Sequence, residues 1–262
     1  YKILPTTVSK ATIKDLQKNL TSGSLNKTII KINGNPEKFP FKHESGIFTL
    51  SGEMNNTSYN FIPKWTGFTN LNGKLSAKNQ SINLKVNSAS LDKLNLQGTS
   101  LEINDISQKH MTLTGDIHIN GSHEDYLDYA RQSPYLAQVT ALEDQITQIT
   151  GSAHTNIKLN LPLDTPNHLK FSGSYAIESS QVSLKSPIVS ISTIQGKLNF
   201  SQNGLEKSKI TAQTLNSPLE LNLLNRNEIN INSANLDYES IATLMKPQLL
   251  QVIHGSALTS VT

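Results

Sequence analysis

Residues 111–119 read MTLTGDIHI, and residues 157–163 read IKLNLPL. In both stretches an apolar residue or glycine occupies every second position, and the intervening positions carry mostly polar residues. A period of two is typical of a β-strand with one buried and one solvated face. These two stretches therefore predict a fold built from one-sided β-strands.

The same alternation recurs along much of the remaining chain. Residues 82–86, 219–223 and 229–231 repeat it, with Asn, Lys or Glu at the intervening positions. Pairs with Asn before Gly are strong turn signals between strands. Such pairs predict hairpin turns at Asn33-Gly34, Asn72-Gly73 and Asn203-Gly204.

Helical spacing interrupts the strands in three places. Residues 13–20 carry apolar side chains at i, i+3 and i+7. Residues 125–151 predict a second helical segment, in which Ile146 and Ile149 share the apolar face with residues nearer its start. Residues 237–255 predict a third. The expected plan is therefore sheet, helix, sheet, helix, sheet.

Related segments recur just over 120 positions apart. The motif around Gly73 returns around Gly196, and the motif around Gly52 returns around Gly173. Such self-similarity indicates a repeated architecture. We predict four parts: the end of a preceding repeat over 1–45, a first β-repeat with a closing helix over 46–150, a second over 151–253, and the start of a further repeat over 254–262. We accordingly expect the chain to be part of a longer protein.

Composition excludes several classes of function. Hydrophobic residues make up 36% of the 262 residues and aromatic residues 6%, which is little for a thick core, while the regular apolar spacing argues against disorder. The net charge is +3 and the lysines are dispersed, so a nucleic-acid interface is not expected. No apolar run approaches the roughly twenty residues that span a bilayer. Cysteine is absent, which excludes thiolate chemistry.

Sequence motifs offer no catalytic or metal site. The phosphate-binding, dinucleotide-binding and G-x-S-x-G motifs are missing, so we expect a protein that is not an enzyme and needs no cofactor. The densest set of metal-ligand types is His110, His118 and His123 with Glu124 and Asp125. Alternation places the first two on a polar face, and the last three are typical of a helix start. No metal site is predicted.

A sheet with one apolar face must cover that face with a second sheet, with helices or with a ligand. Three short helices are too few for so many strands. A β-sandwich core therefore remains open as one interpretation, and a sheet curled into a trough around an apolar guest remains as the other.

Several motifs, taken in order, resemble a known family. They are Phe-Pro-Phe at 39–41, the aromatic run at 59–65, Leu-Asn-Gly-Lys-Leu at 71–75, Ser133-Pro134, and Leu-Asn-Leu-Pro-Leu at 159–163. Together they resemble the periplasmic regions of the AsmA-like family of Gram-negative envelope proteins. The chain departs from that family in its high content of Asn, Ser and Lys.

The resemblance implies a bridge-like lipid transporter that is anchored in the inner membrane and spans the periplasm. Its expected fold is mainly β with a few short helices, an elongated, repeated antiparallel β-sheet curled into a hydrophobic, taco-like groove. Its expected partners are phospholipid or another acyl-chain lipid, the inner membrane through an anchor outside this chain, and the outer membrane. Neither catalytic residues nor a cofactor are implied. The alternatives are an envelope scaffold or chaperone for outer-membrane protein assembly and a surface adhesin β-domain.

The groove implied by the resemblance would be lined by the apolar side of the strands. The predicted lining residues are Phe48, Leu50, Leu75, Ile82, Leu84, Val86, Met111, Leu113, Ile117, Ile119, Ile157, Leu159, Leu161, Phe171, Tyr175, Leu198, Phe200, Leu219, Leu221, Leu223, Ile229 and Ile231.

Overall fold

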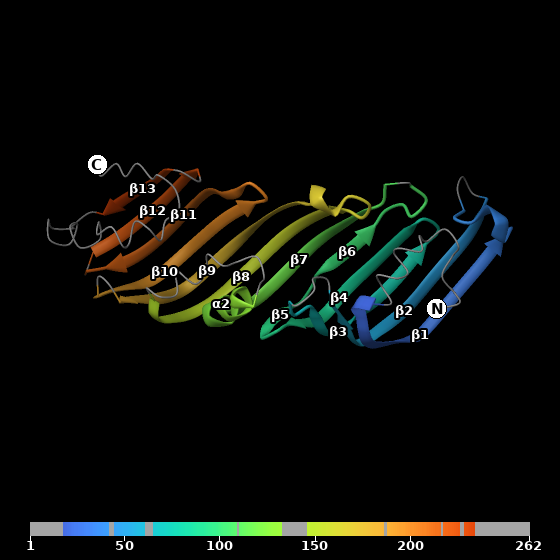
Figure 1. Ribbon diagram of the computed structural model, residues 1–262, viewed down its shortest axis with the longest axis horizontal. Helices are drawn as coiled ribbons and strands as arrows, with labels where there is room; N and C mark the ends of the chain where they lie inside the picture. Colours follow the sequence, from blue (N-terminus) through green and yellow to red (C-terminus); the bar gives the residue numbers. More distant parts are fainter. Residues whose placement is uncertain are drawn as a thin grey trace. The chain divides into compact units, whose positions relative to one another are not determined.

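The strands of this protein form one antiparallel sheet (Figure 1). The computed structural model describes residues 18–41, 45–60, 65–108, 110–132, 146–185, 188–215, 217–225 and 228–233. Over these residues the sheet has 13 strands in the order β1-β2-β3-β4-β5-β7-β8-β9-β10-β11-β12-β13, and β6 pairs with β4 and β7. The predicted mainly β, antiparallel fold is confirmed.

The chain divides into two compact units. Unit 1 comprises Tyr1–Ile119 with Ile157–Phe171, and unit 2 comprises Asn120–Asn156 with Ser172–Thr262. The elements up to the first described helix are β1 (Leu20–Gly34), the 3₁₀ turn η1 (Pro36–Lys38), β2 (Gly46–Tyr59), β3 (Phe68–Lys78), β4 (Ser81–Leu91), β5 (Leu94–Leu96), β6 (Ser100–Ile103) and β7 (Thr112–Ser122). The later ones are α2 (His123–Arg131), β8 (Ile146–Pro162), η2 (Pro166–His168), β9 (Lys170–Lys185), β10 (Ile188–Ser201), β11 (Gly204–Thr214), β12 (Ser217–Asn225) and β13 (Glu228–Ser233).

Strand register in unit 1 separates apolar from polar side chains. Residues opposite each other in antiparallel strands lie on the same face. Leu75 of β3 pairs with Leu84 of β4, and Leu84 pairs with Leu101 of β6. The next position along β3, Lys74, pairs with Lys85 instead. The alternation read from the sequence therefore becomes one apolar and one polar face.

Unit 2 has the same two-faced register. Ile210 of β11 pairs with Gly196 of β10 and Leu221 of β12, and Leu221 pairs with Ile231 of β13. Lys209, one position away, pairs with Asn222. A one-residue slip would move every side chain to the wrong face, so the pattern itself fixes this register.

A bulge interrupts the register at equivalent positions of the two units. In unit 1 the ladder between β2 and β3 shifts between Met54 and Thr57, where Asn56 has φ +46°. In unit 2 the ladder between β9 and β10 shifts around Ser180, next to Ser179 with φ +41°. Each extra residue leaves the apolar positions on both sides of it on one face.

Two glycines show why the motif at Gly73 recurs at Gly196, 123 positions later. A Cβ at Gly73 would lie 2.3 Å from the carbonyl oxygen of Lys85 in the neighbouring strand. At Gly196 it would lie 2.4 Å from the carbonyl oxygen of Lys209. The two positions therefore require glycine because the adjacent backbone approaches closely.

The structure corrects three local predictions. Asn72-Gly73 lies inside β3 and is not a turn. Glycine occurs there because the backbone of β4 approaches Gly73 closely. Ile146 and Ile149 belong to β8, not to a helix: their run is rich in β-branched residues, and Thr147 Oγ1 donates to the carbonyl of Ser183 in β9. Leu20, the last apolar position of the first predicted helix, begins β1.

Other predicted features have different outcomes. Asn203-Gly204 joins β10 to β11 as a hairpin turn, and Gly34 ends β1 at φ +127°. Most of the first predicted helix and residues 133–145 lie outside the described residues, as does the third helical segment over 237–255.

Several of the most deeply buried side chains of unit 1 lie at the bulged end of its strands. Leu94 and Leu96 of β5 are 1% and 2% exposed, and Leu94 pairs with the buried Leu91 of β4. Leu71 of β3, opposite Thr57, is also buried. Phe41, 2% exposed, lies against Gly34 and Gly46 at the other end of β1 and β2. Deep burial is therefore found at both ends, whereas most predicted lining residues between them are half-buried.

Candidate functional site

The aliphatic rows along the middle of the strands are the main candidate site. Of the 22 predicted lining residues, Val86, Ile119, Leu219 and Leu223 are buried. The other 18 are half-buried, and none is fully exposed. A closed sandwich core buries inward aliphatic side chains almost completely. These rows instead keep part of their apolar surface accessible.

In unit 1 the rows cross several strands without a polar interruption. One row runs from Leu50 through Ala77 and Ile82 to Ile103 and Leu113. It crosses β2, β3, β4, β6 and β7, and its leucine and isoleucine side chains are half-buried. Such a row presents a continuous apolar strip perpendicular to the strands.

A second row of unit 1 contains glycines at both ends. Leu75, Leu84 and Leu101 follow one another from β3 to β6, between Gly52 and Gly115. A Cβ at Gly115 would lie 2.7 Å from Leu101 and 3.4 Å from Leu159 of β8. Leu159 therefore lies on the same face as the row.

Unit 2 contains corresponding rows. Tyr175 of β9 lies opposite Leu198 of β10, and both are half-buried. Leu223 of β12 lies opposite Ile229 of β13. Among the strands that the structure describes, all belong to one sheet, which does not fit a sandwich of two sheets.

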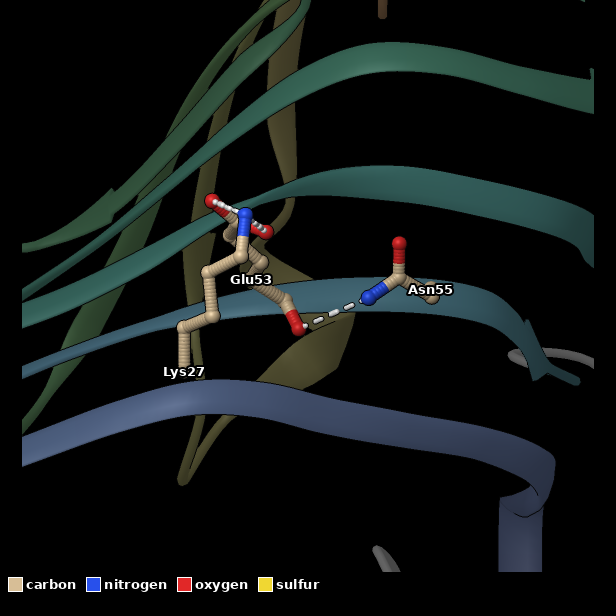
Figure 2. A network of polar contacts seen from close by, with 3 residues as sticks. All are labelled: Lys27, Glu53 and Asn55. Atoms are coloured by element: carbon tan, nitrogen blue, oxygen red, sulfur yellow. Dashed lines mark hydrogen bonds and ion pairs between the residues drawn. The ribbon is translucent and has the colours of Figure 1, made fainter.

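The opposite face carries polar networks. Figure 2 shows Lys27 of β1 paired with Glu53 of β2, with a nitrogen-to-oxygen distance of 3.0 Å, and the side chain of Asn55 donating to the backbone carbonyl of Glu53. On β11 and β12, Lys209 pairs with Glu220 at 2.5 Å. The hydrogen bond from Lys209 holds the pKa of Glu220 below its ordinary value. This face is therefore solvated, as the sequence predicts.

Sequence reasoning missed the exposed apolar side chains of β1. Ile29 and Ile32 are 58% and 59% exposed, and Leu25 and Ile30 are exposed as well. The register places Ile30 and Ile32 on the apolar face, opposite Leu50 and Phe48, and places Ile29 on the polar face. Ile47 of β2 is exposed on that polar face too. The cluster at 29–32 is visible in the sequence, but its exposure follows from the position of β1 at the end of the described strand order.

The three histidines considered as metal ligands have separate partners. His110 Nδ1 contacts Asp164 Oδ2, and this hydrogen bond lowers the pKa of the Asp164 carboxyl group. His118 Nε2 lies 3.7 Å from Asp116 Oδ1. His123 is buried in unit 2. Over the described ranges, no group of three or more His, Cys, Asp or Glu side chains is arranged to hold a metal ion.

His123 begins α2, as the sequence predicts for a helix start. Ser122 caps the helix: its hydroxyl accepts from the backbone N–H of Asp125, and the Asp125 carboxylate accepts from the Ser122 backbone. Burial lowers the pKa of His123. The role of His123 inside a polar cluster is not visible in the sequence, because its partners lie more than fifty positions away.

One open hollow lies apart from the aliphatic rows. It has a volume of about 470 Å³ and lies at the hairpin ends of unit 2, between Asn203–Lys207 and Leu224–Asn225. Exposed Leu205 and Leu224 line it together with Glu206 and Lys207. Its mixed lining lacks the continuity of the rows. The described residues include no helix that is long and apolar enough to cross a membrane.

Comparison with known proteins agrees with this geometry. The chain is 23% identical over 202 residues to the intermembrane phospholipid transporter YhdP of Escherichia coli K12, a match that covers 77% of this chain and 16% of that protein. The chain thus spans about a sixth of the length of this relative. No solved structure matches. The family model described as YhdP protein matches residues 3–262, and the chain therefore belongs to the YhdP family.

Proposed function

We propose that this chain is a periplasmic segment of a bridge-like lipid transporter and carries phospholipid along a hydrophobic groove between the inner and outer membranes. The observation that supports it most strongly is the half-burial of continuous aliphatic rows on one face of the sheet. The named relative transports phospholipid between membranes, which is the task that such a face suits.

Acyl chains gain free energy when an apolar surface replaces water around them. Each methylene kept out of water is worth about 0.8 kcal/mol, so an apolar strip lowers the barrier for a lipid that crosses an aqueous compartment. The rows contain few polar groups that would bind a lipid at one fixed position. A conduit must release its cargo as readily as it accepts it, and a uniform aliphatic lining allows this.

The proposal includes the organisation predicted from the sequence. The 22 lining residues form the floor and walls of the groove, in repeats over 46–150 and 151–253. The groove acts without a cofactor, and the protein is not an enzyme. It is held in the periplasm by an inner-membrane anchor outside this chain and contacts the outer membrane.

The exposed apolar side chains of β1 favour a second candidate function. β1 lies at the end of the described strand order and exposes Ile29, Ile30 and Ile32, and a strand of this kind pairs readily with an extended segment of another protein. An envelope scaffold or chaperone for outer-membrane proteins would use such an edge. An adhesin domain has no comparable support.

Native mass spectrometry of the purified 262-residue chain, expressed in a Gram-negative periplasm, separates the two functions. The transporter proposal expects bound phospholipid, and Leu161→Asp should remove it by placing a charge in the apolar path. Asn160→Asp, one position along β8 and exposed, is the matched control and should retain lipid. A lipid-free chain that captures unfolded β-barrel segments would support the chaperone. Normal lipid content in folded Leu161→Asp would contradict the conduit.

A further inference from the structure

Helix α2 lies against the apolar face of unit 2, not beside it. Tyr175 of β9 is on this face, opposite Leu198. The ring of Tyr126 meets the ring of Tyr175 edge-on, with centroids 5.1 Å apart and planes at 77°, and the His123 ring centroid lies 5.7 Å away. These contacts place the first turn of α2 over a residue that the proposed groove requires.

His123 joins this turn to the sheet by two hydrogen bonds, to Tyr175 and Ser180, which together are called the His123 latch. Its Nδ1 lies 2.6 Å from the Tyr175 hydroxyl, and its Nε2 contacts the Ser180 hydroxyl. The side chain is only 6% exposed. Both ring nitrogens of a buried histidine are thus satisfied by β9.

The partners determine which nitrogen carries the proton. The Ser180 hydroxyl donates to the carbonyl of Glu178 at 3.1 Å, so its oxygen accepts from His123. Nε2 is therefore the protonated nitrogen, and Nδ1 accepts the hydroxyl proton of Tyr175. Both hydrogen bonds are therefore made by the neutral form of His123, in which one ring nitrogen donates and the other accepts.

The site that receives His123 is built into the bulge. Ser180 is 2% exposed and lies against Gly151 of β8, where a Cβ would come within 2.4 Å of its hydroxyl. Glycine at position 151 lets β8 and β9 approach each other closely, with the Ser180 hydroxyl in contact with His123 of α2. The latch is thus a specific contact between one helix residue and a structural feature of the sheet.

We propose that α2 is a gate on the lipid path, closed by the His123 latch, which covers Tyr175 until an acyl chain displaces the helix. This inference rests on the proposed function. Closure keeps Tyr175 covered between passages. Opening breaks the two His123 hydrogen bonds and the contact between Tyr126 and Tyr175, and it also releases Tyr126 from Thr155 and exposes the buried Tyr129.

The test combines hydrogen exchange of the α2 amides with titration of cis-parinaric acid, a fluorescent acyl chain, into the full chain. His123→Phe keeps the ring and removes both hydrogen bonds, and Tyr175→Phe removes one of them. Exchange over residues 124–131 should become about tenfold faster in His123→Phe and less so in Tyr175→Phe. Because the apparent Kd falls as the open fraction rises, it should decrease about threefold or more.

His154→Phe is the matched control, because His154 is exposed on β8 of the same unit and gains the same ring. It should change neither readout. Faster α2 exchange with unchanged probe binding would overturn the gate and leave the proposed function intact, as would unchanged exchange in both latch variants. If neither the unmodified chain nor any variant bound the probe, the proposed function and the gate would fail together.

Discussion

The bulges at Thr57 in unit 1 and at Ser180 in unit 2 have similar backbone geometry, but different side chains contact them. In unit 1, a Cβ at Gly23 would lie 2.5 Å from the Thr57 hydroxyl, and in unit 2 a Cβ at Gly151 would lie 2.4 Å from the Ser180 hydroxyl. Both hydroxyls donate to the carbonyl two residues earlier. Only for Ser180 does the structure show a histidine added to this arrangement.

The strand geometry is common to the two bulges, but the side chains that pack against each bulge differ. Thr57 lies opposite buried Leu71, so the bulge of unit 1 adjoins an apolar core. Ser180 receives a polar latch from a helix. Both bulges thus have a glycine and a hydroxyl that shape the strands, whereas the neighbouring residues decide whether the bulge adjoins an apolar core or a helix.

The largest expected effect tests whether the shared geometry is a requirement of both units. Gly151→Ala and Gly23→Ala place a Cβ against the facing strand at φ +104° and +133°, so each should lower the free energy of unfolding by about 2–4 kcal/mol. Gly204→Ala is the control: its φ is +109°, but nothing lies within 4 Å of the added Cβ. Urea titration should show a smaller loss there. Equal losses at all three positions would mean that φ alone matters.

The next effect sharpens the difference between the two bulges. His123→Ala removes two hydrogen bonds and leaves a cavity, and should destabilise unit 2 by about 2–3 kcal/mol. Leu71→Ala should destabilise unit 1 by a similar amount through its cavity. Hydrogen exchange, resolved by segment, should show loss of protection in β9 for the first and in β3 for the second. The opposite assignment would contradict the separate packing of the two bulges.

A smaller effect is pH dependence confined to unit 2. The lowered pKa of His123 means that its neutral form stabilises the folded state fully above the unfolded pKa of about 6.5, and that this stabilisation is lost as the pH falls through the folded pKa. The described contacts of the ring are with Tyr175 and Ser180 of β9, and neither group titrates in this range. The protection of the α2 amides, corrected for the intrinsic exchange rate at each pH, should therefore fall below about pH 6.5. In His123→Phe this pH dependence should disappear.

The smallest effect lies on the polar face. Lys27→Ala should change the free energy of unfolding by no more than about 0.5 kcal/mol, because Lys27 and Glu53 are exposed and solvent screens their attraction. Salt titration of the unmodified chain should likewise leave the urea midpoint nearly constant. A large loss in Lys27→Ala would show that β1 depends on this pair more than its geometry indicates.

Several features of the fold and site could be predicted because they are local. Alternation at residues 82–86 and 219–223 predicted strands that the structure confirms in β4 and β12. The predicted helix start at His123 is confirmed because a capping box needs only neighbouring residues. Ile146 and Ile149 were misassigned because their spacing fits a helix as well as a strand, and pairing with β9 decided between them.

The amino-acid sequence by itself determined that the strands have one apolar and one polar face, because the two-residue period of a strand is a property of the chain. It also determined the recurrence of Gly73 at Gly196. Only the tertiary structure decided that His123 contacts Tyr175 and Ser180, because these residues lie more than fifty positions away along the chain. The register shift between β9 and β10 occurs at Ser180 itself. It also decided that the aliphatic rows stay half-buried, because accessibility depends on what lies against a face and not on the residues within it.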